Sequence, residues 1–383
     1  MRHLACCTII LLFFISQFVH IIDFEKPSHS FFGKMSYDEK ILYVGGTGAN
    51  NYTKIQDAIN AANDGDIIFV YSDSSPYYEN VVINKSVKLI GEKREDTIID
   101  GKGERVITVD SNNVEIKHFT LINGSGVRVN GNFNLICNND ILGKGKGNGV
   151  YNSDGMHGNK IYNNKISGYS DGILLRYDGY EIHVINNSIS NCEYCILVNC
   201  IGYSLIGNTI VDGDFAIYIA SFGREQCFVN NNSISNVSYG ICVESFTPLC
   251  YVENNTVYNA GTAIRVMGNA GNATIKNNIL SDGYYGIRLS SNNSVIRNEI
   301  DNFIYGIEAL GRNNTILKNN FVGNRRNAVF QAIPNTWDSN YWYNWKFPLP
   351  KPIFGMTGKL SLIPWIQFDY HPAKEPWKIG GGK

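Results

Sequence analysis

A four-residue pattern recurs ten times in this chain: a small residue, then two apolar residues, mostly branched, that flank one variable position. The first small residue is Gly126, the last is Ala328, and successive copies lie 20 to 24 residues apart. A period of this length without helical spacing inside it is typical of a β-solenoid, in which each repeat forms one coil. Strands of successive coils then run parallel, and parallel crossovers are overwhelmingly right-handed. The repeat therefore predicts an all-β fold, a single-stranded right-handed parallel β-helix.

A second column of residues repeats in phase with the first. An asparagine stands two residues before an apolar residue once per coil, as at Asn139, Asn164, Asn187, Asn208, Asn232, Asn255, Asn278 and Asn298, and the last member is Asn319. Coils stack at about 4.8 Å, so like residues lie above like residues. Asparagine tolerates left-handed backbone angles and can form hydrogen bonds along its own stack. We interpret this column as a structural ladder at a turn rather than as a catalytic feature.

The strand that follows each small residue has an inward and an outward side. Period two places Ile173 and Leu175 inside and Leu174 outside. The outward column reads Arg128, Tyr151, Leu174, Leu197, Tyr218, Cys242, Arg265, Arg288, Glu308 and Phe330. Sugars pack on apolar and aromatic surfaces of this kind. We therefore predict carbohydrate contacts from Tyr151, Leu174, Tyr218, Arg265 and Arg288; the alternative is side-chain stacking under a covering loop.

The turn after this strand varies most between coils, and solenoids often carry function on such a line. On two successive turns it holds ionisable side chains, namely Asp154, His157, Arg176, Asp178, Glu181 and His183. Two carboxylates beside an arginine or histidine can support hydrolysis or β-elimination, which makes these six the candidate catalytic residues. The alternative is a solvated turn. An offset of 23 residues predicts Asp154 over Tyr177 and His157 over Tyr180.

The N-terminal end carries two predicted features. Residues 1–36 contain an uncharged apolar stretch from Leu4 to Ile22, which indicates a signal peptide or an N-terminal membrane anchor. Thr53 and Gln56 fit a helix capping box, and apolar residues follow on one helical face. We expect a helix over 53–63 that caps the end of the solenoid.

The C-terminal end changes composition. All five tryptophans and seven of the ten prolines lie from Pro334 onward, and proline is excluded from central strands. We expect the β-helix to span 37–336 and residues 337–383 to form an irregular cap; a surface-binding module is the alternative.

Composition limits the possible partners. Charged residues make up 17% of the chain, the formal net charge is −1, and no basic patch suggests nucleic acid. Seven cysteines lie beyond the apolar leader. Cys227 and Cys250 occupy equivalent places on adjacent coils and are close enough to be bridged. The trio Cys192, Cys195 and Cys200 has the look of a metal or redox group, but buried packing explains it better.

The chain resembles secreted β-helix proteins of the carbohydrate-binding and sugar-hydrolase repeat class. The resemblance rests on the opening Thr53–Ile59, on Gly65–Val70 and Tyr78–Ile83, and on the Asn-x-Ile coils. The chain is most similar to the NosD type, named for a periplasmic copper-binding accessory protein, and Trp337–Trp342 is similar to the Trp-rich stretch that closes many relatives. The Asn-Thr-Asp and Gly-His-Gly motifs of polygalacturonases are absent.

These observations lead to one hypothesis and two alternatives. We expect an exported β-helix protein that binds carbohydrate or cell-surface polymer, with catalysis unproven and a membrane contacted only through a possible N-terminal anchor. The alternatives are a polysaccharide lyase or glycoside hydrolase, and a NosD-like copper-binding accessory protein. Copper is implied by the resemblance alone, because Met156, His157 and His183 are the nearest suitable ligands outside the cysteine trio. The residues assign no metal site and no cofactor.

Overall fold

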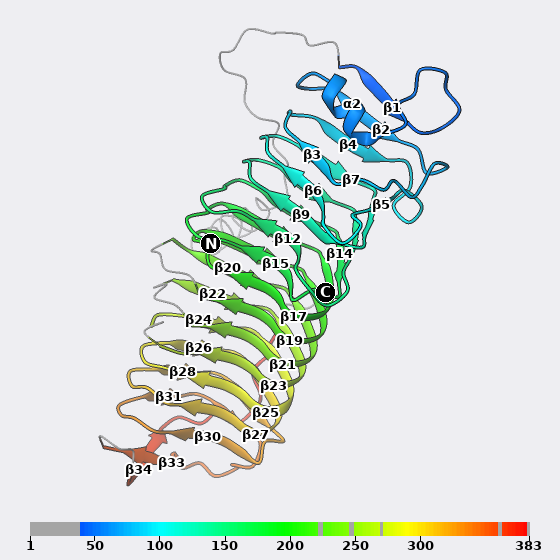
Figure 1. Ribbon diagram of the computed structural model, residues 1–383. Coiled ribbons are helices and arrows are strands. Elements are labelled where there is room, and N and C mark those ends of the chain that lie inside the picture. The colour runs from blue at the N-terminus through cyan, green and yellow to red at the C-terminus, as the bar shows by residue number, and fades with distance from the viewer. Residues whose placement is uncertain (1–38, 221–224, 245–248, 269–270, 359–361, 381–383) are drawn as a thin grey trace, which may run out of the picture. The chain divides into compact units, whose positions relative to one another are not determined.

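The computed structural model describes residues 39–220, 225–244, 249–268, 271–358 and 362–380, which form a right-handed parallel β-helix with three sheets (Figure 1). The predicted fold class is confirmed. The segment 1–36, predicted to be a signal peptide or anchor, lies outside the described residues.

Sheet 1 contains the repeated strand that follows the small residue. Its strands pair in parallel from coil to coil. They are β3 (Val81–Ile83), β6 (Arg105–Val109), β9 (Ser125–Val129), β12 (Asn148–Asn152), β15 (Asp171–Leu175), the second halves of β17 (Ser188–Val198), β19 (Thr209–Ile219), β21 (Ser233–Val243), β23 (Thr256–Val266), β25 (Ile279–Leu289) and β27 (Glu299–Ala309), and β30 (Arg326–Phe330).

Sheet 2 contains the strand that precedes each ladder asparagine. It comprises β1 (Ile41–Val44), β2 (Ile67–Val70), β4 (Lys88–Gly91), β7 (Glu115–Lys117), β10 (Leu135–Cys137), β13 (Lys160–Tyr162), β16 (Ile182–Ile185), β18 (Tyr203–Ile206), β20 (Cys227–Asn230), β22 (Cys250–Glu253), β24 (Thr274–Lys276), β26 (Ser294–Ile296), β28 (Thr315–Leu317) and β31 (Thr336–Asp338).

Sheet 3 follows the ladder and comprises β5 (Ile98–Asp100), β8 (Thr120–Ile122), β11 (Asp140–Leu142), β14 (Lys165–Ser167), the first halves of β17, β19, β21, β23, β25 and β27, and the strands β29 (Asn320–Val322) and β32 (Tyr341–Trp342). In the middle coils a single bent strand therefore belongs to sheet 3 in its first half and to sheet 1 in its second half.

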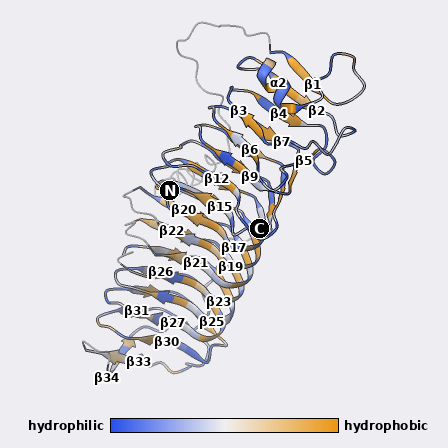
Figure 2. Ribbon diagram, viewed as in Figure 1, coloured by the Kyte–Doolittle hydropathy of each residue, from blue (hydrophilic) through white to orange (hydrophobic). Residues whose placement is uncertain are grey.

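Alternating side chains of the three sheets fill the interior. Ile173 and Leu175 are fully buried, as the two-residue period predicts, and the same holds for their counterparts in neighbouring coils. Figure 2 shows hydrophobic residues recurring along the strands of every coil. The burial of these apolar rows is the main favourable term for a fold whose coils touch only their neighbours.

The asparagine column forms the predicted ladder inside the turn between sheets 2 and 3. Asn232 is representative: its Oδ1 accepts from the backbone N and the Nδ2 of Asn208, while its Nδ2 donates to the Leu205 carbonyl and to Oδ1 of Asn255. The left-handed backbone angle falls on the preceding residue instead, for example Asn231 at φ 56°. The sequence suggested that one asparagine both adopts the left-handed angle and forms the ladder. In the structure the first residue of the pair adopts the angle and the second forms the ladder hydrogen bonds.

The N-terminal helix is shorter than predicted and is capped differently. Helix α2 (Ile55–Ala61) buries Ile55, Ala58 and Ile59, as expected for a plug over the first coils. Its N-cap residue is Lys54, and no side chain within the helix caps it, so the predicted capping role of Thr53 is wrong. The Glu79 carboxylate accepts from the backbone N of Ile55 and Gln56 at 2.8 and 3.0 Å.

The C-terminal segment is more regular than the predicted cap. The parallel ladder continues through β31 and β32, which lie at and beyond residue 336. The chain then forms an antiparallel hairpin of β33 (Lys351–Thr357) and β34 (Ile363–Asp369). Strand β33 pairs with β30 at the end of sheet 1, and β34 pairs with β31 at the end of sheet 2. The buried Asp369 terminates the ladder, because its Oδ2 accepts from the backbone N and the Nδ2 of Asn340.

The cysteines are buried and free in the described residues. Cys227 and Cys250 are direct neighbours on β20 and β22, as the spacing predicts, but they form no disulfide in this structure. Cys195 is fully buried in the small-residue column, in agreement with a packing role.

Candidate functional site

The first part of the predicted catalytic line contains an ion pair. Nε of Arg176 lies 3.1 Å from Oδ1 of Asp154, and both side chains are partly solvated. The guanidinium of Arg176 also lies 4.8 Å from the ring centroid of Tyr177. Arg176 is thus held by a carboxylate on the neighbouring coil and by the ring of the next residue in its own turn.

His157 lies where the 23-residue offset places it. Its ring stacks on Tyr180 with centroids 4.5 Å apart and 4° between the planes, and Phe133 packs edge-on against its other side at 5.0 Å. Its imidazole therefore forms part of a cluster of three rings on successive turns.

The remaining predicted catalytic residues lie in different surroundings. Asp178 and Glu181 are exposed turn residues with φ of 59° and 54°. His183 lies on β16 next to Lys160, and burial, followed by the Lys160 charge, lowers its pKa. Among the described residues, no hydrogen bond or ion pair joins these three to the Asp154–Arg176 pair. Their catalytic role stays a prediction.

The outward column of sheet 1 has the predicted register up to Glu308 and departs from it at the last member. Glu308 pairs with Val329, so Phe330 points into the core and its assignment as an outward residue is wrong. The reason is that Ala328 pairs with Ile307 and not with Gly306, so the predicted alignment of the last copy was shifted by one residue. Leu174 and Cys242 point outward but are covered by their neighbours, with 8% and 0% exposure. The predicted apolar stripe is therefore not an open surface at these two positions.

Tyr218 and Arg265 are joined through a carboxylate that lies between their coils. The Tyr218 hydroxyl donates to Oε2 of Glu244 at 2.7 Å, and Nη2 of Arg265 lies 2.9 Å from Oε1. Burial, together with the Glu244 hydrogen bond, raises the pKa of Tyr218. The guanidinium of Arg265 also lies over the ring of Tyr239 at 5.6 Å.

Sequence reasoning missed a second outward column of aromatic side chains. Tyr194, Phe215 and Tyr239 occupy the position directly before the small residue in three successive coils, and Tyr285 and Tyr305 do so after an interruption at Thr262. Their recurrence directly before the small residue of each coil was visible in the sequence.

The rings of this aromatic column are largely engaged with one another. Phe215 stacks on Tyr194 at 4.8 Å and on Tyr239 at 4.7 Å, with planes within 6° of parallel. Arg288 covers Tyr285 at 4.4 Å. Sugar stacking needs free ring faces, so the middle coils offer ring edges and hydroxyls rather than a stacking surface.

An exposed tryptophan ring lies where sheet 1 meets the C-terminal hairpin. A cleft of about 830 Å³, here called the end cleft, lies between the outer side of β25, β27 and β30 and the hairpin β33–β34. Its walls include Tyr305 and Arg326 on the sheet side and Lys351 and Trp365 on the hairpin side. The Trp365 side chain is 50% exposed. Cleft sizes of a few hundred to a thousand Å³ are usual for ligand sites.

The polar groups of the end cleft are held in place. Glu308 is nearly buried, lies 2.6 Å from Nε of Arg288 and accepts from Gln331 at 3.1 Å. Lys351 packs over the rings of Trp345 and Trp342 at 4.7 and 5.9 Å, and burial lowers its pKa. Aromatic walls with a few fixed polar groups are the arrangement that sugar binding requires.

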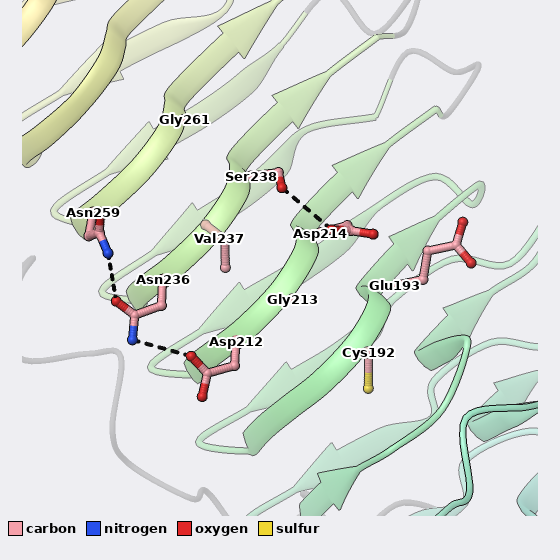
Figure 3. Close-up of a pocket in the computed structure, with 10 residues that line it drawn as sticks. All are labelled: Cys192, Glu193, Asp212, Gly213, Asp214, Asn236, Val237, Ser238, Asn259 and Gly261. Carbon is pink, nitrogen blue, oxygen red and sulfur yellow. Dashed lines mark hydrogen bonds between the residues drawn. The ribbon is translucent and has the colours of Figure 1, made fainter.

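An acidic groove lies at the bend between sheets 3 and 1, over β17, β19, β21 and β23 (Figure 3). Glu193 and Asp214 project from neighbouring coils, and Asp212 accepts a hydrogen bond from Asn236. Sequence reasoning did not single out this groove. It is shallow and open, and nothing in it points to a particular ligand.

In the described ranges no three His, Cys, Asp or Glu side chains gather so that they could hold a metal ion. The described helix is too short to cross a lipid bilayer, and no other described segment forms a membrane-spanning helix.

Comparison with known families supports the predicted resemblance. Residues 166–346, just under half of the chain, match the model of the family described as "Periplasmic copper-binding protein (NosD)". The resemblance to NosD-type β-helix proteins is thus confirmed. None of the curated proteins matches the chain.

Solved structures share the fold at low sequence identity. A GH87 α-1,3-glucanase catalytic domain in complex with nigerose matches with a TM-score of 0.52 and 14% identity, over 82% of this chain and 70% of that one. The DFA-IIIase from Arthrobacter chlorophenolicus A6 matches with a TM-score of 0.52 and 12% identity, over 88% of this chain and 100% of that one. The ORF18 protein of Geobacillus virus E2 has a TM-score of 0.37 and 14% identity; the match covers 79% of this chain but only 57% of that protein. At these identities the likeness shows the fold alone.

Proposed function

We propose that this protein binds polysaccharide outside the cytoplasm and that the end cleft holds the glycan. The observation that carries the proposal is an exposed Trp365 ring that lines a cleft of about 830 Å³, together with Tyr305 of the sheet wall. An extracytoplasmic location is supported by the printed description of the matching family and by the apolar segment in residues 1–36. The fold agrees, since a GH87 glucanase with bound nigerose shares it.

Recognition in the end cleft combines stacking with hydrogen bonding. The exposed face of Trp365 can pack against the apolar face of a sugar ring. Asn327 and Asn344 lie on the cleft wall and are hydrogen-bonded to each other at 3.1 Å, which fixes both amides for contacts with sugar hydroxyls. Glu308 is held by Arg288 and supplies an acceptor. Trp365, Asn327 and Glu308 lie on strands β34, β30 and β27, so little ordering of these side chains accompanies binding.

The proposal is tested by screening the full chain on a glycan array and repeating the measurement with Trp365→Ala. Loss of most binding is expected for this variant. Tyr258→Ala is the matched control, because Tyr258 is 51% exposed and lies on sheet 3 outside the cleft. Denaturation midpoints of both variants exclude a folding defect. If Tyr218→Ala abolishes binding while Trp365→Ala does not, the glycan lies on the middle of sheet 1 and the assignment to the end cleft is wrong.

The full chain and its bound polymers also test the two alternatives, an enzyme and a copper-binding protein. New reducing ends or unsaturated products from a bound polymer, lost in Arg176→Ala and His183→Ala, would support an enzyme that uses the predicted catalytic line. The family match is the observation that favours copper handling. Stoichiometric copper after loading and desalting would support that alternative, and a trace amount would contradict it.

A further inference from the structure

Three cationic side chains gather at the end cleft. Arg325 and Arg326 lie at the start of β30 and are exposed, and Lys351 opens β33 on the opposite wall. Lys351 is distant in sequence from the two arginines, and the pairing of β33 with β30 brings it to the same cleft.

These cations have no acidic partner among the described residues. The carboxylate of the cleft, Glu308, is already paired with Arg288 at 2.6 Å. Arg326 lies over the ring of Tyr305 at 5.6 Å, and Lys351 lies over two tryptophan rings. Because Lys351 is half-buried among rings, its charge has lost hydration without gaining an ion pair. The cleft therefore carries an excess of positive charge that a bound anion would neutralise.

We infer that the end cleft selects an acidic polysaccharide, whose carboxylate or sulfate groups contact Arg325, Arg326 and Lys351. This inference rests on the proposed glycan binding and adds the substrate class. Guanidinium groups recognise planar carboxylates and sulfates through paired hydrogen bonds. The Trp365 ring holds the neutral part of the sugar, and the cations hold its charged group.

The charge of other surfaces of the solenoid also favours binding of an anionic polymer at the end cleft. The groove at the bend between sheets 3 and 1 carries Glu193, Asp212 and Asp214, which repel an anionic polymer. With a net charge near zero, the chain as a whole has no general attraction for anions. A polyanion that binds this protein is thus directed to the C-terminal end by local charge.

The test compares matched polymers on the full chain. Polygalacturonate is measured against its fully methyl-esterified form, and dextran sulfate against dextran, which separates carboxylate from sulfate recognition. We expect at least one acidic polymer to bind at least tenfold more tightly than its neutral counterpart. The variant Arg325→Gln with Arg326→Gln should lose most of that preference while binding to neutral sugars changes less than twofold. Raising the salt concentration should weaken binding of the acidic polymer only.

The control removes the same charge outside the cleft. Arg297 and Arg312 are exposed and do not line it, so Arg297→Gln with Arg312→Gln should leave the preference intact. Equal binding of acidic and neutral polymers, or an equal loss in both double variants, overturns the inference and leaves the proposed glycan binding standing. If no polymer or array glycan binds at all, both the inference and the proposed function are wrong.

Discussion

The asparagine ladder gives the sharpest stability prediction, and Asn232→Gly is the change that tests it. Asn232 is 1% exposed and lies in the middle of the ladder. Its amide accepts two hydrogen bonds from Asn208 and donates to Leu205 and Asn255, at 2.9 to 3.0 Å. Glycine removes this amide and leaves two donors of Asn208 without their acceptor, while the Leu205 carbonyl loses one of its donors.

Each buried polar group left unpaired costs about 1–3 kcal/mol. Two such groups predict a loss of about 2–6 kcal/mol, and water that enters the vacated space offsets part of this sum. The matched control is Asn231→Gly at the neighbouring position. Asn231 is exposed and has φ 56°, an angle that glycine adopts freely, so the control should change stability by less than about 1 kcal/mol.

Guanidinium denaturation followed by circular dichroism measures the difference between the two variants. Hydrogen exchange then locates the weakened coils, which should include β18, β20 and β22. If Asn232→Gly and Asn231→Gly shift the midpoint equally, the ladder amides do not stabilise the solenoid and the reasoning is wrong.

Three further predictions, with four substitutions, concern other parts of the fold. Glu79→Ala should destabilise by about 1–2 kcal/mol, because two helix N–H groups lose their acceptor, whereas Thr53→Ala should stay within about 0.5 kcal/mol in thermal unfolding; equal effects would restore the capping-box interpretation. His183 has a lowered pKa in the folded state, so the unfolded chain binds more protons and stability falls as the pH drops below about 6.5; His183→Gln should flatten the dependence of the denaturation midpoint on pH between 7 and 5, and an unchanged slope would contradict this. Ile241→Asp places a charge in the core and should cost ~3 kcal/mol or more, which soluble yield and denaturation would show.

The sequence was sufficient for features that repeat. Coil period, strand register and the inward direction of Ile173 and Leu175 follow from a pattern that is present ten times, so errors at single positions average out. The one register error, at Phe330, occurs in the last copy, where no further coil exists to correct the alignment.

Features that depend on contacts between distant segments were missed. The cap of α2 comes from Glu79, which lies 24 residues after Ile55, so a local motif at Thr53 was mistaken for it. The end cleft forms because the C-terminal hairpin folds back on sheet 1 through Phe330 and Gly355. No sequence period predicts such a contact, and the tryptophans alone could not show which faces stay open.

Hydrogen exchange of the full chain with and without its preferred glycan tests the central claim most directly. The account predicts that the polymer protects β30, β33 and β34, which form the walls of the end cleft, and leaves exchange in residues 154–183 unchanged. Protection of residues 154–183 with none in the hairpin would contradict it and would place the glycan on the predicted catalytic line.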